Sequence, residues 1–270
     1  MDNFEGSAPW DGAVYMSTSA DGLSFSGEKL FIDRAGVPNL LFTSDNRLIA
    51  TFQYFSFKNQ DMFDVIAYTV SEDLGKTWST VNKIYFTGLG KFGPGSPNPV
   101  DPTLVELDDG SYRLYFTYHA PGEKFPGLYS ARSQALNEPF LSEGPQLKTE
   151  KMILDPAVIN YGGIWHHYTV RHDERAAGGF VNVHSTSDTG LNFMLQDDIV
   201  LDMQFLGQVI EDNGKLRFYG SGDGVKSAVS KDGYTWTIDS GTRTAGADPG
   251  VVKLPDSTYL MIYTKVEPKN

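Results

Sequence analysis

Three aspartates stand directly before a proline at the start of short apolar segments, at Asp101-Pro102, Asp155-Pro156 and Asp248-Pro249. If the fold brings these carboxyls together, like-charge repulsion keeps a proton on one of them while another stays ionised. Such a set can supply the general acid and the base that hydrolysis of a glycosidic bond requires. An equally weighted alternative is structural, in which each Asp caps backbone N–H groups where a strand begins.

The aspartates belong to a repeat that spans the chain. A short apolar strand opened by Pro or Gly recurs, with its aligned residue at Pro38, Pro102, Pro156, Gly207 and Pro249. The spacings of 64, 54, 51 and 42 residues are typical of β-propeller blades with loops of variable length. The interval from the last aligned proline, through both termini, to the first one is 59 residues, so one blade can be assembled from the two ends.

A second repeat is a turn, most complete at 71–78, Ser-Glu-Asp-Leu-Gly-Lys-Thr-Trp. Asp73 is placed to accept hydrogen bonds from backbone N–H groups, Gly75 can adopt a positive φ, and Trp78 can pack between neighbouring sheets. The degenerate copies, of which the second lacks both Asp and Gly, lie at 19–25, 133–140, 186–193 and 230–236. Five turns therefore accompany the five strand starts.

These repeats predict an all-β fold, a five-bladed β-propeller with four-stranded antiparallel blades that forms a single domain over residues 1–270. Residues 10–33 are expected to pair with 250–265, so that N- and C-terminal strands share the last blade. Asp109-Gly110 and similar turn residues predict the first hairpin of each blade. The blade after the shared one should have strands near 37–43, 47–54, 63–70 and 80–86.

Because strand direction alternates, the starts of the first strands and the loops between second and third strands should lie on one face. These loops are expected near 53–64, 118–127, 172–179, 220–224, and 265 onward together with 9–12. They carry more polar and aromatic side chains than connection requires, which points to ligand binding. With the strand residue Gln208, the candidate ligand contacts are Trp10, Tyr54, Tyr118, His119, Glu123, Arg171 and His172.

Aromatic and histidine residues outside this set have structural interpretations. Trp78 and Trp236 are expected to be core residues, whereas Trp165, like Trp10, is free to stack on a sugar. His166 and His167 are adjacent on a strand and must point to opposite faces, so they cannot form one metal site unaided. We predict half-buried or surface histidines, no metal site and no cofactor, with a cation in the central funnel left open as an alternative.

Composition limits the partners. The formal net charge of −12 argues against nucleic acid, which needs clustered Lys and Arg, and fits neutral or cationic partners. No apolar run reaches the roughly 18 residues of a membrane span, and the first residues lack the pattern of a signal peptide. The chain has no cysteine, which leaves the compartment open. We expect a monomer and favour a secreted or periplasmic location.

The turn at 71–78 resembles the Asp-box (BNR repeat) of sialidases and other β-propellers. The five-blade count, together with the run from Asp101-Pro102 to Asp109-Gly110, resembles the five-bladed glycoside hydrolases of family 43. This second resemblance implies a base at Asp248, a pKa modulator at Asp101 and the acid at Asp155. The family has Glu as the acid, so the loop residues Glu123, Asp173 and Glu174 are alternatives, whereas Glu143-Gly144-Pro145 precedes no strand hairpin and is interpreted as coincidence.

Residues 37–78 also resemble the first repeat of sialidases. The arginine expected two places before Pro38 is Gly36, and the other strand starts lack Arg too. A carboxylate-binding arginine triad is therefore absent from the pattern, and sialidase activity is disfavoured.

The sequence therefore predicts a glycoside hydrolase, or a close relative of one, that acts on a neutral sugar or short glycan with carboxylates as acid and base. A carbohydrate-binding propeller without catalysis and an interaction scaffold are the alternatives. The uneven distribution of the Asp residues and the unequal loops favour the enzyme, since a lectin should repeat similar pockets blade by blade.

Overall fold

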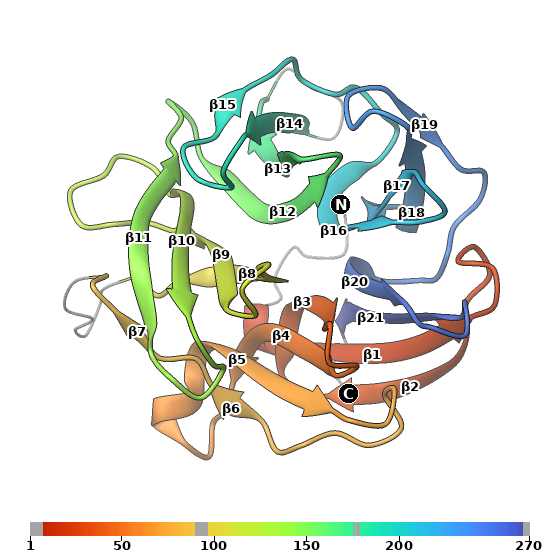
Figure 1. The fold of residues 1–270 in the computed structure, drawn as a ribbon, viewed down its shortest axis with the longest axis horizontal. Helices are drawn as coiled ribbons and strands as arrows, with labels where there is room; N and C mark the ends of the chain where they lie inside the picture. Colours follow the sequence, from red (N-terminus) through yellow and green to blue (C-terminus); the bar gives the residue numbers. More distant parts are fainter. Residues whose placement is uncertain (1–7, 90–96, 175, 177–178, 267–270) are drawn as a thin grey trace.

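The protein folds into five antiparallel β-sheets arranged as the blades of a ring (Figure 1). The computed structural model describes residues 8–89, 97–174, 176 and 179–266. Blade 1 comprises β3 (Ala35–Phe42), β4 (Leu48–Phe55), β5 (Phe63–Ser71) and β6 (Asn82–Lys83). Blade 2 comprises β8 (Val100–Glu106), β9 (Tyr112–Tyr118), β10 (Gly127–Ser133) and β11 (Phe140–Leu147).

The other blades follow the same plan. Blade 3 comprises β12 (Ile153–Tyr161), β13 (Ile164–His172), β14 (Phe180–Ser187) and β15 (Met194–Leu195). Blade 4 comprises β16 (Gln204–Glu211), β17 (Leu216–Gly222), β18 (Gly224–Ser230) and β19 (Trp236–Ile238). Blade 5 comprises β20 (Ala247–Lys253), β21 (Tyr259–Val266), β1 (Gly12–Ser19) and β2 (Ser26–Ile32). The predicted fold class, an all-β five-bladed propeller, is confirmed.

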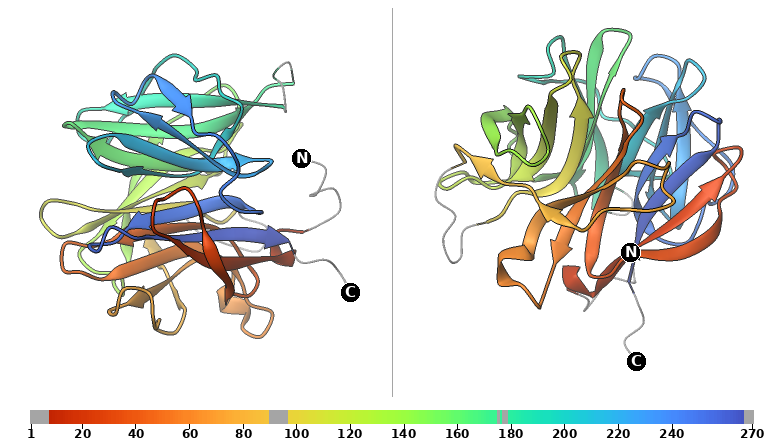
Figure 2. Two further views of the ribbon diagram at one scale, coloured as in Figure 1. Left: turned by 90° about the vertical axis from the view of Figure 1, so that its right-hand side faces the viewer. Right: turned by 60° about the horizontal axis from the view of Figure 1, so that its bottom comes forward.

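Strands from both ends of the chain close the ring in blade 5. β1 pairs with β21 along its whole length, from Gly12 opposite Val266 to Ser19 opposite Tyr259. In Figure 2 the blue β20 and β21 lie beside the red β1 and β2. The predicted sharing of this blade is therefore confirmed, and the first and last strands hold the ring together through backbone hydrogen bonds.

Blade 2 carries one strand more than predicted. β7 (Phe86–Thr87) runs parallel to β11 at the outer edge, and the N–H of Phe140 donates to the carbonyl of Tyr85. The Phe86 ring lies 5.1 Å from that of Phe116. Apolar packing therefore holds the chain leaving blade 1 against blade 2, where it also covers an exposed sheet edge.

The hydrophobic core is divided among the interfaces between blades. The first strands β3, β8, β12, β16 and β20 contact one another in this order around the ring. Five apolar clusters lie between the blades, and one of them joins Ile49 and Ile66 of blade 1 to Leu104 and Leu114 of blade 2. Because each sheet is covered on both faces, its inner strands are apolar on both faces, which explains the short continuous apolar runs in the sequence.

The predicted hydrogen bonds of the 71–78 turn are present. The N–H of Thr77 donates to Asp73 Oδ1 at 2.8 Å, and Gly75 has a φ of 84°. The pKa of Asp73 is lowered to about 2 by hydrogen bonds from Thr77. The Trp78 indole donates to the carbonyl of Gly75 at 3.2 Å, but its ring is only half-buried.

A contact between blades that the sequence did not suggest recurs three times. Tyr115, Tyr168 and Tyr219 lie on the second strands of blades 2, 3 and 4. Their hydroxyls donate to the carbonyls of Gly190, Gly233 and Gly22 at 2.7, 2.8 and 2.9 Å, each in the turn of the next blade. These buried hydrogen bonds fix each turn against the preceding blade.

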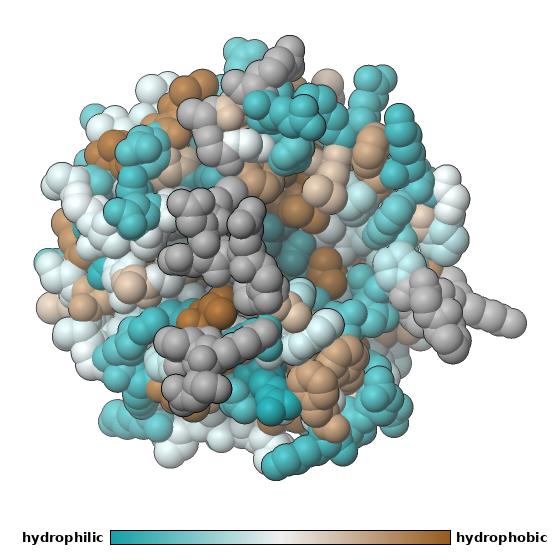
Figure 3. Space-filling model, turned by 180° about the vertical axis from the view of Figure 1, so that it is seen from behind, coloured by the Kyte–Doolittle hydropathy of each residue, from teal (hydrophilic) through white to brown (hydrophobic). Residues whose placement is uncertain are grey.

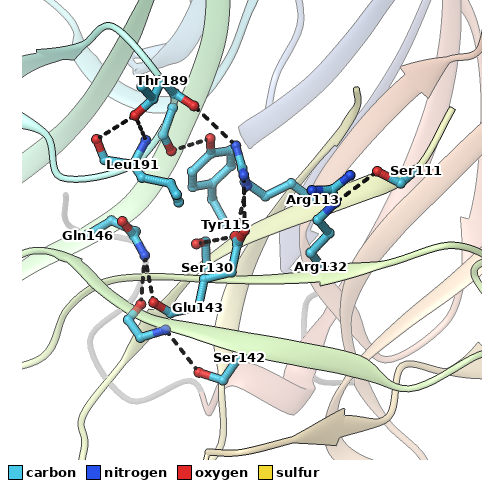
Figure 4. Close-up of polar contacts among 12 residues, drawn as sticks. Ser111, Arg113, Tyr115, Ser130, Arg132, Ser142, Glu143, Gln146, Thr189 and Leu191 are labelled. Atoms are coloured by element: carbon cyan, nitrogen blue, oxygen red, sulfur yellow. Dashed lines mark hydrogen bonds and ion pairs between the residues drawn. The ribbon is translucent and has the colours of Figure 1, made fainter. Parts of the chain in front are cut away.

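Around Tyr115 this contact extends into a polar network (Figure 4). Arg113 makes a two-pronged ion pair with Glu143, at 2.8 and 2.9 Å, and also donates to the carbonyl of Thr189. Glu143 accepts a further hydrogen bond from Ser130 at 2.7 Å. Glu143 on β11 therefore has structural partners on β9 and β10 of the same blade, in keeping with the interpretation of its motif as coincidence.

Candidate functional site

Each first strand contains a β-bulge at its aligned Pro or Gly. The register shifts fall between residues 36 and 39, 100 and 103, 154 and 157, 204 and 208, and 247 and 250. Asp101, Asp155 and Asp248 lie in these bulges with φ of 56°, 56° and 49°. A bulge releases a residue from the regular alternation of side chains and redirects it. The same device thus acts on three aspartates that are far apart in the sequence.

The unusual backbone belongs to the blade design and not to the aspartates alone. Val37 occupies the corresponding bulge of blade 1 with a φ of 47°, although a β-branched residue is poorly suited to the left-handed region. In blade 4 the bulge contains Leu206 and Gly207. What distinguishes blades 2, 3 and 5 is therefore the carboxyl group itself.

Side chains of the preceding blade satisfy the N–H groups that the bulges leave unpaired. The N–H of Val37 donates to Thr264 Oγ1 at 3.1 Å, and that of Asp248 donates to Ser221 Oγ at 2.9 Å. Between blades 2 and 3 the acceptor is a carboxylate oxygen, because the N–H of Asp155 donates to Asp101 Oδ2 at 3.3 Å. The carboxylate of Asp101 therefore also stabilises the bulge of blade 3, by accepting the backbone hydrogen bond of Asp155.

Asp101, Asp155 and Asp248 form what we term the carboxyl cluster. Burial raises the pKa of Asp155 well above its usual value, and the charges of Asp101 and Asp248 raise it further. Burial together with Asp101 raises the pKa of Asp248 to about 7, and burial together with Asp64 raises that of Asp101 to about 6. The structure thus brings together the three aspartates that the sequence singled out.

The three carboxyls differ in their hydrogen bonds. Asp101 accepts from Thr117 and from the N–H of Asp155, and Asp248 Oδ1 lies 3.3 Å from Ser221 Oγ. Among the residues that the structure describes, none donates a hydrogen bond to the carboxyl of Asp155. An unpartnered carboxyl under the influence of two others is the one that keeps its proton most readily.

Gln208 connects the first strands of three blades. Its Oε1 accepts from the N–H groups of Leu40 and Val251, both at 3.0 Å, and its Nε2 donates to the carbonyl of Leu40 at 2.6 Å. The amide that was predicted to contact a ligand is thus engaged with backbone on β3 and β20. Gln208 acts in this structure as a link across the ring.

The aromatic candidates lie in different surroundings. Trp10 is 41% exposed, and its ring centroid lies 5.8 Å from that of Phe63 and 6.5 Å from that of Phe57. Tyr54 is half-buried beside Phe52, whereas Tyr118 is 3% exposed and donates to the carbonyl of Leu89 at 3.1 Å. Of the three, Trp10 offers the most accessible aromatic surface.

The polar loop candidates are held by local partners. His119 Nε2 lies 2.8 Å from the carbonyl of Glu123, whose carboxylate pairs with Lys148. Arg171 pairs with Asp198 at 2.7 Å, and His172 is exposed beside Phe180. His119 and Glu123 thus share the loop after β9, Arg171 and His172 end β13, and none of these contacts links the four residues to the carboxyl cluster.

The alternative acids are no closer to the cluster. Asp173 pairs with Lys151 at 3.4 Å, and Glu174 is exposed. Glu123 pairs with Lys148, as described above. No contact connects any of the three to Asp101, Asp155 or Asp248, so Asp155 is the only acid candidate that the described residues place in the cluster.

Figure 3 shows the face of the ring that contains the start of β1 and the end of β21, with hydrophilic residues along much of its edge and hydrophobic ones among them. Trp165 does not belong to this face. It lies at the start of β13, at the opposite end of the blade, and packs against Tyr115 and Gly190. The prediction that Trp165 is free to stack on a sugar is therefore wrong, because it fills a contact between blades 2 and 3.

The prediction of half-buried or surface histidines is wrong for three of the five. His166, His167 and His184 are at most 1% exposed. His166 Nδ1 lies 3.0 Å from His184 Nε2, while His167 bonds Ser185 on the other face of the sheet, as predicted for adjacent strand residues. Burial lowers the pKa of all three. These rings complete the interfaces between blades.

Within the described parts of residues 8–266, no group of three or more His, Asp and Glu residues is arranged to hold a metal ion. Over the same residues no helix has the length and apolar character needed to cross a bilayer.

Asp64 is the residue of this site that the sequence did not single out. It is the second residue of β5 and has a φ of 55°, in a bulge between the pairs Tyr54–Val65 and Phe55–Phe63, and its charge acts on Asp101. In the sequence Asp64 was one of several acidic residues near the predicted loop at 53–64. It differed from the others only in lying one residue inside the strand expected near 63–70.

No protein-family model matches the chain, and no curated protein matches it by sequence. Among solved structures, a thermostable family 43 glycoside hydrolase superposes with a TM-score of 0.61 at 13% identity, over 85% of this chain and 88% of the other. A family 117 glycoside hydrolase from the marine bacterium Zobellia galactanivorans has a TM-score of 0.57 at 13% identity, covering 86% and 84%. A Hadza microbial sialidase has a TM-score of 0.57 at 18% identity, covering 82% and 50%. At these identities the likeness establishes the five-bladed fold alone.

Proposed function

We propose that the protein is a glycoside hydrolase, or a close relative of one, and that it cleaves the glycosidic bond of a neutral sugar or short glycan at the centre of the ring. The observation that carries this proposal is the convergence of Asp101, Asp155 and Asp248 from three blades. The raised pKa values of these groups leave a protonated carboxyl near neutrality. The family 43 and family 117 glycoside hydrolases that share the fold agree with this choice.

In the proposed mechanism Asp155 is the general acid. Its carboxyl has no donor among the described residues and lies beside two further carboxyls, so it retains the proton that it gives to the glycosidic oxygen. As the bond from that oxygen to the anomeric carbon breaks, water attacks the carbon and Asp248 accepts the proton of the water. Asp101 fixes the backbone of Asp155 and raises its pKa.

The charge of the site supports a neutral substrate. No Lys or Arg within the described parts of the chain pairs with Asp101, Asp155 or Asp248. An anionic sugar would therefore meet uncompensated negative charge, which argues against sialidase activity. Trp10 and, at the edge, Tyr54 would supply aromatic surface for the sugar.

In this proposal the acting unit is one propeller domain over residues 1–270, functioning as a monomer. The resemblance of the 71–78 turn to an Asp-box belongs to the same proposal, and the hydrogen bonds of Ser71 and Asp73 support it. Size-exclusion chromatography with light scattering would test the oligomeric state.

The test is a panel of aryl glycosides and oligosaccharides assayed for hydrolysis and, by calorimetry, for binding. Asp248→Asn should lower turnover of an accepted substrate about a hundredfold or more while binding persists, because the base is removed with little change of shape. Asp256→Asn, in a turn on the opposite face, is the control and should keep activity. If the wild type binds a glycan but hydrolyses none of the panel, the protein is a carbohydrate-binding propeller, the alternative that the exposed Trp10 favours.

A further inference from the structure

Asp64 acts on the carboxyl cluster from a third strand, β5, whereas the other carboxylates lie on first strands. Blade 1 has Val37 in the bulge where blades 2, 3 and 5 have Asp. The same blade supplies Asp64 from the start of its third strand, again in a bulge and again in the left-handed region. The carboxylate that blade 1 lacks on β3 is thus replaced by one from β5.

Two amides from two blades orient this carboxylate. Gln53 Nε2, on β4 of blade 1, donates to Asp64 Oδ1 at 2.6 Å. Asn98 Nδ2, just before β8 of blade 2, donates to Asp64 Oδ2 at 3.2 Å and to its carbonyl oxygen at 2.8 Å. Asn98 lies between Pro97 and Pro99, which restrict its backbone. A carboxylate that accepts from both sides in this way is held in one orientation.

The partners of Asp64 are neutral, so its charge is not cancelled where it is held. β8, which contains Asp101, packs against β3, β4, β5, β9 and β12. Their ionisable groups are Tyr54 on β4, Asp64 and Tyr68 on β5, Arg113, Tyr112, Tyr115 and Tyr118 on β9, and Asp155 and Tyr161 on β12. Arg113 is opposite Val105 at the far end of β8 and pairs with Glu143. The only formal charges that these strands bring to Asp101 at its own end are those of Asp64 and Asp155.

We infer that Asp64 is a positioning residue of the site, which acts through Asp101 by holding a fixed negative charge beside it. The inference rests on the proposed function for its consequence in catalysis, but the electrostatic contact itself exists whether or not the protein is an enzyme. Asp64 repels the ionised form of Asp101 and so favours a shared proton within the carboxyl cluster. Blade 1 in this way adjusts the protonation of groups on blades 2, 3 and 5.

The backbone conformation of Asp64 allows its charge to be removed without disturbing the local fold. Asn and Gly both tolerate a φ near 55°, so Asp64→Asn and Asp64→Gly remove the charge without opposing the local fold. Asp61→Asn is the matched control, because Asp61 lies three residues earlier, in the turn Gln60–Met62 before β5, and is exposed. The three variants and the wild type would be labelled at the Asp side-chain carbonyl carbon and titrated by NMR between pH 3 and pH 9.

Removal of the Asp64 charge should lower the midpoint of the Asp101 signal by about one pH unit, whereas Asp61→Asn should leave it in place. An unchanged midpoint in both folded Asp64 variants would overturn the inference. If the panel yields a substrate, the acidic limb of the rate profile should move in the same direction. Absence of turnover would contradict the proposed function alone, because the titration is measured without substrate.

Discussion

Replacing Asp248 with Asn should make the protein more stable at pH 8, although the same change should remove the base of the proposed reaction. The pKa of Asp248 is raised from the usual 3.8 to about 7 by burial and by the charge of Asp101. A group whose pKa is raised on folding contributes stability that is complete below pH 3.8 and is lost as the pH rises through about 7. At pH 8 the ionised Asp248 therefore destabilises the folded state.

The magnitude follows from the two pKa values. A difference of about 3 corresponds to about 4 kcal/mol of unfolding free energy. Asp248 keeps some contact with solvent, and solvent screens part of this electrostatic destabilisation. We therefore expect Asp248→Asn to raise the unfolding free energy by about 1–3 kcal/mol at pH 8. The Asn Oδ1 can still accept from Ser221, so that contact is retained. At pH 4 the folded wild type is itself protonated there, and the difference should be close to zero.

Urea denaturation of the wild type and Asp248→Asn at pH 4, 6 and 8 would measure the change. Asp256→Asn is the control, and its change in unfolding free energy at pH 8 should have the opposite sign. The pKa of Asp256 is lowered by hydrogen bonds from Thr258, so its charge stabilises the fold above pH 3.8 and the variant should lose stability at pH 8. A variant Asp248→Asn less stable than the wild type at pH 8 would refute the reasoning and favour the interpretation of Asp248 as a structural cap.

Three further predictions concern the ring itself. Trp236→Ala should lower the unfolding free energy by about 3–5 kcal/mol, because the ring is buried. Trp78→Ala should lower the unfolding free energy by less in the same denaturant melts, because Trp78 is half-buried. Equal losses in the two variants would contradict this. Tyr219→Phe should cost about 1–3 kcal/mol, since it leaves the buried carbonyl of Gly22 without its donor, and a neutral result in denaturant melts would show that this contact between blades is dispensable. The pKa of His184 is lowered to about 3 by burial, so its contribution to stability is present above pH 6.5 and is lost as the pH falls, by about 2 kcal/mol at pH 5. The variant His184→Gln should lack this dependence, so its difference in unfolding free energy from the wild type should change by about 2 kcal/mol between pH 7 and pH 5. The difference for His172→Gln, at an exposed position, should stay constant over the same range.

Several properties of the protein could be predicted from the sequence because they depend on neighbouring residues. The number of blades follows from the recurrence of Pro or Gly before an apolar strand, and turn residues such as Asp109-Gly110 mark each first hairpin. The hydrogen bonds of Asp73 lie within one turn, so the local pattern specifies them. Pairing of the terminal strands was predictable because a ring with one incomplete blade has a single way to close.

Other properties arise only when distant blades meet. The chain separates Asp64, Asp101, Asp155 and Asp248 by tens of residues, and their mutual effect depends on the order of the blades and on bulges that no local pattern specifies. Gln208 was predicted to be one of the residues that contact a ligand. The structure engages its amide with backbone of two other blades, since the bulges leave N–H groups there that need an acceptor.

The same reason explains the buried side chains. The sequence suggests surface or loop positions for Tyr118, His166, His167 and His184, because polar groups suggest exposure. Each lies at an interface between blades in the folded ring, where a neighbouring hydroxyl, ring nitrogen or carbonyl group satisfies a polar atom. Local chemistry therefore determines the blade, whereas the packing of five blades around one axis decides which polar side chains become core and which carboxyls come together.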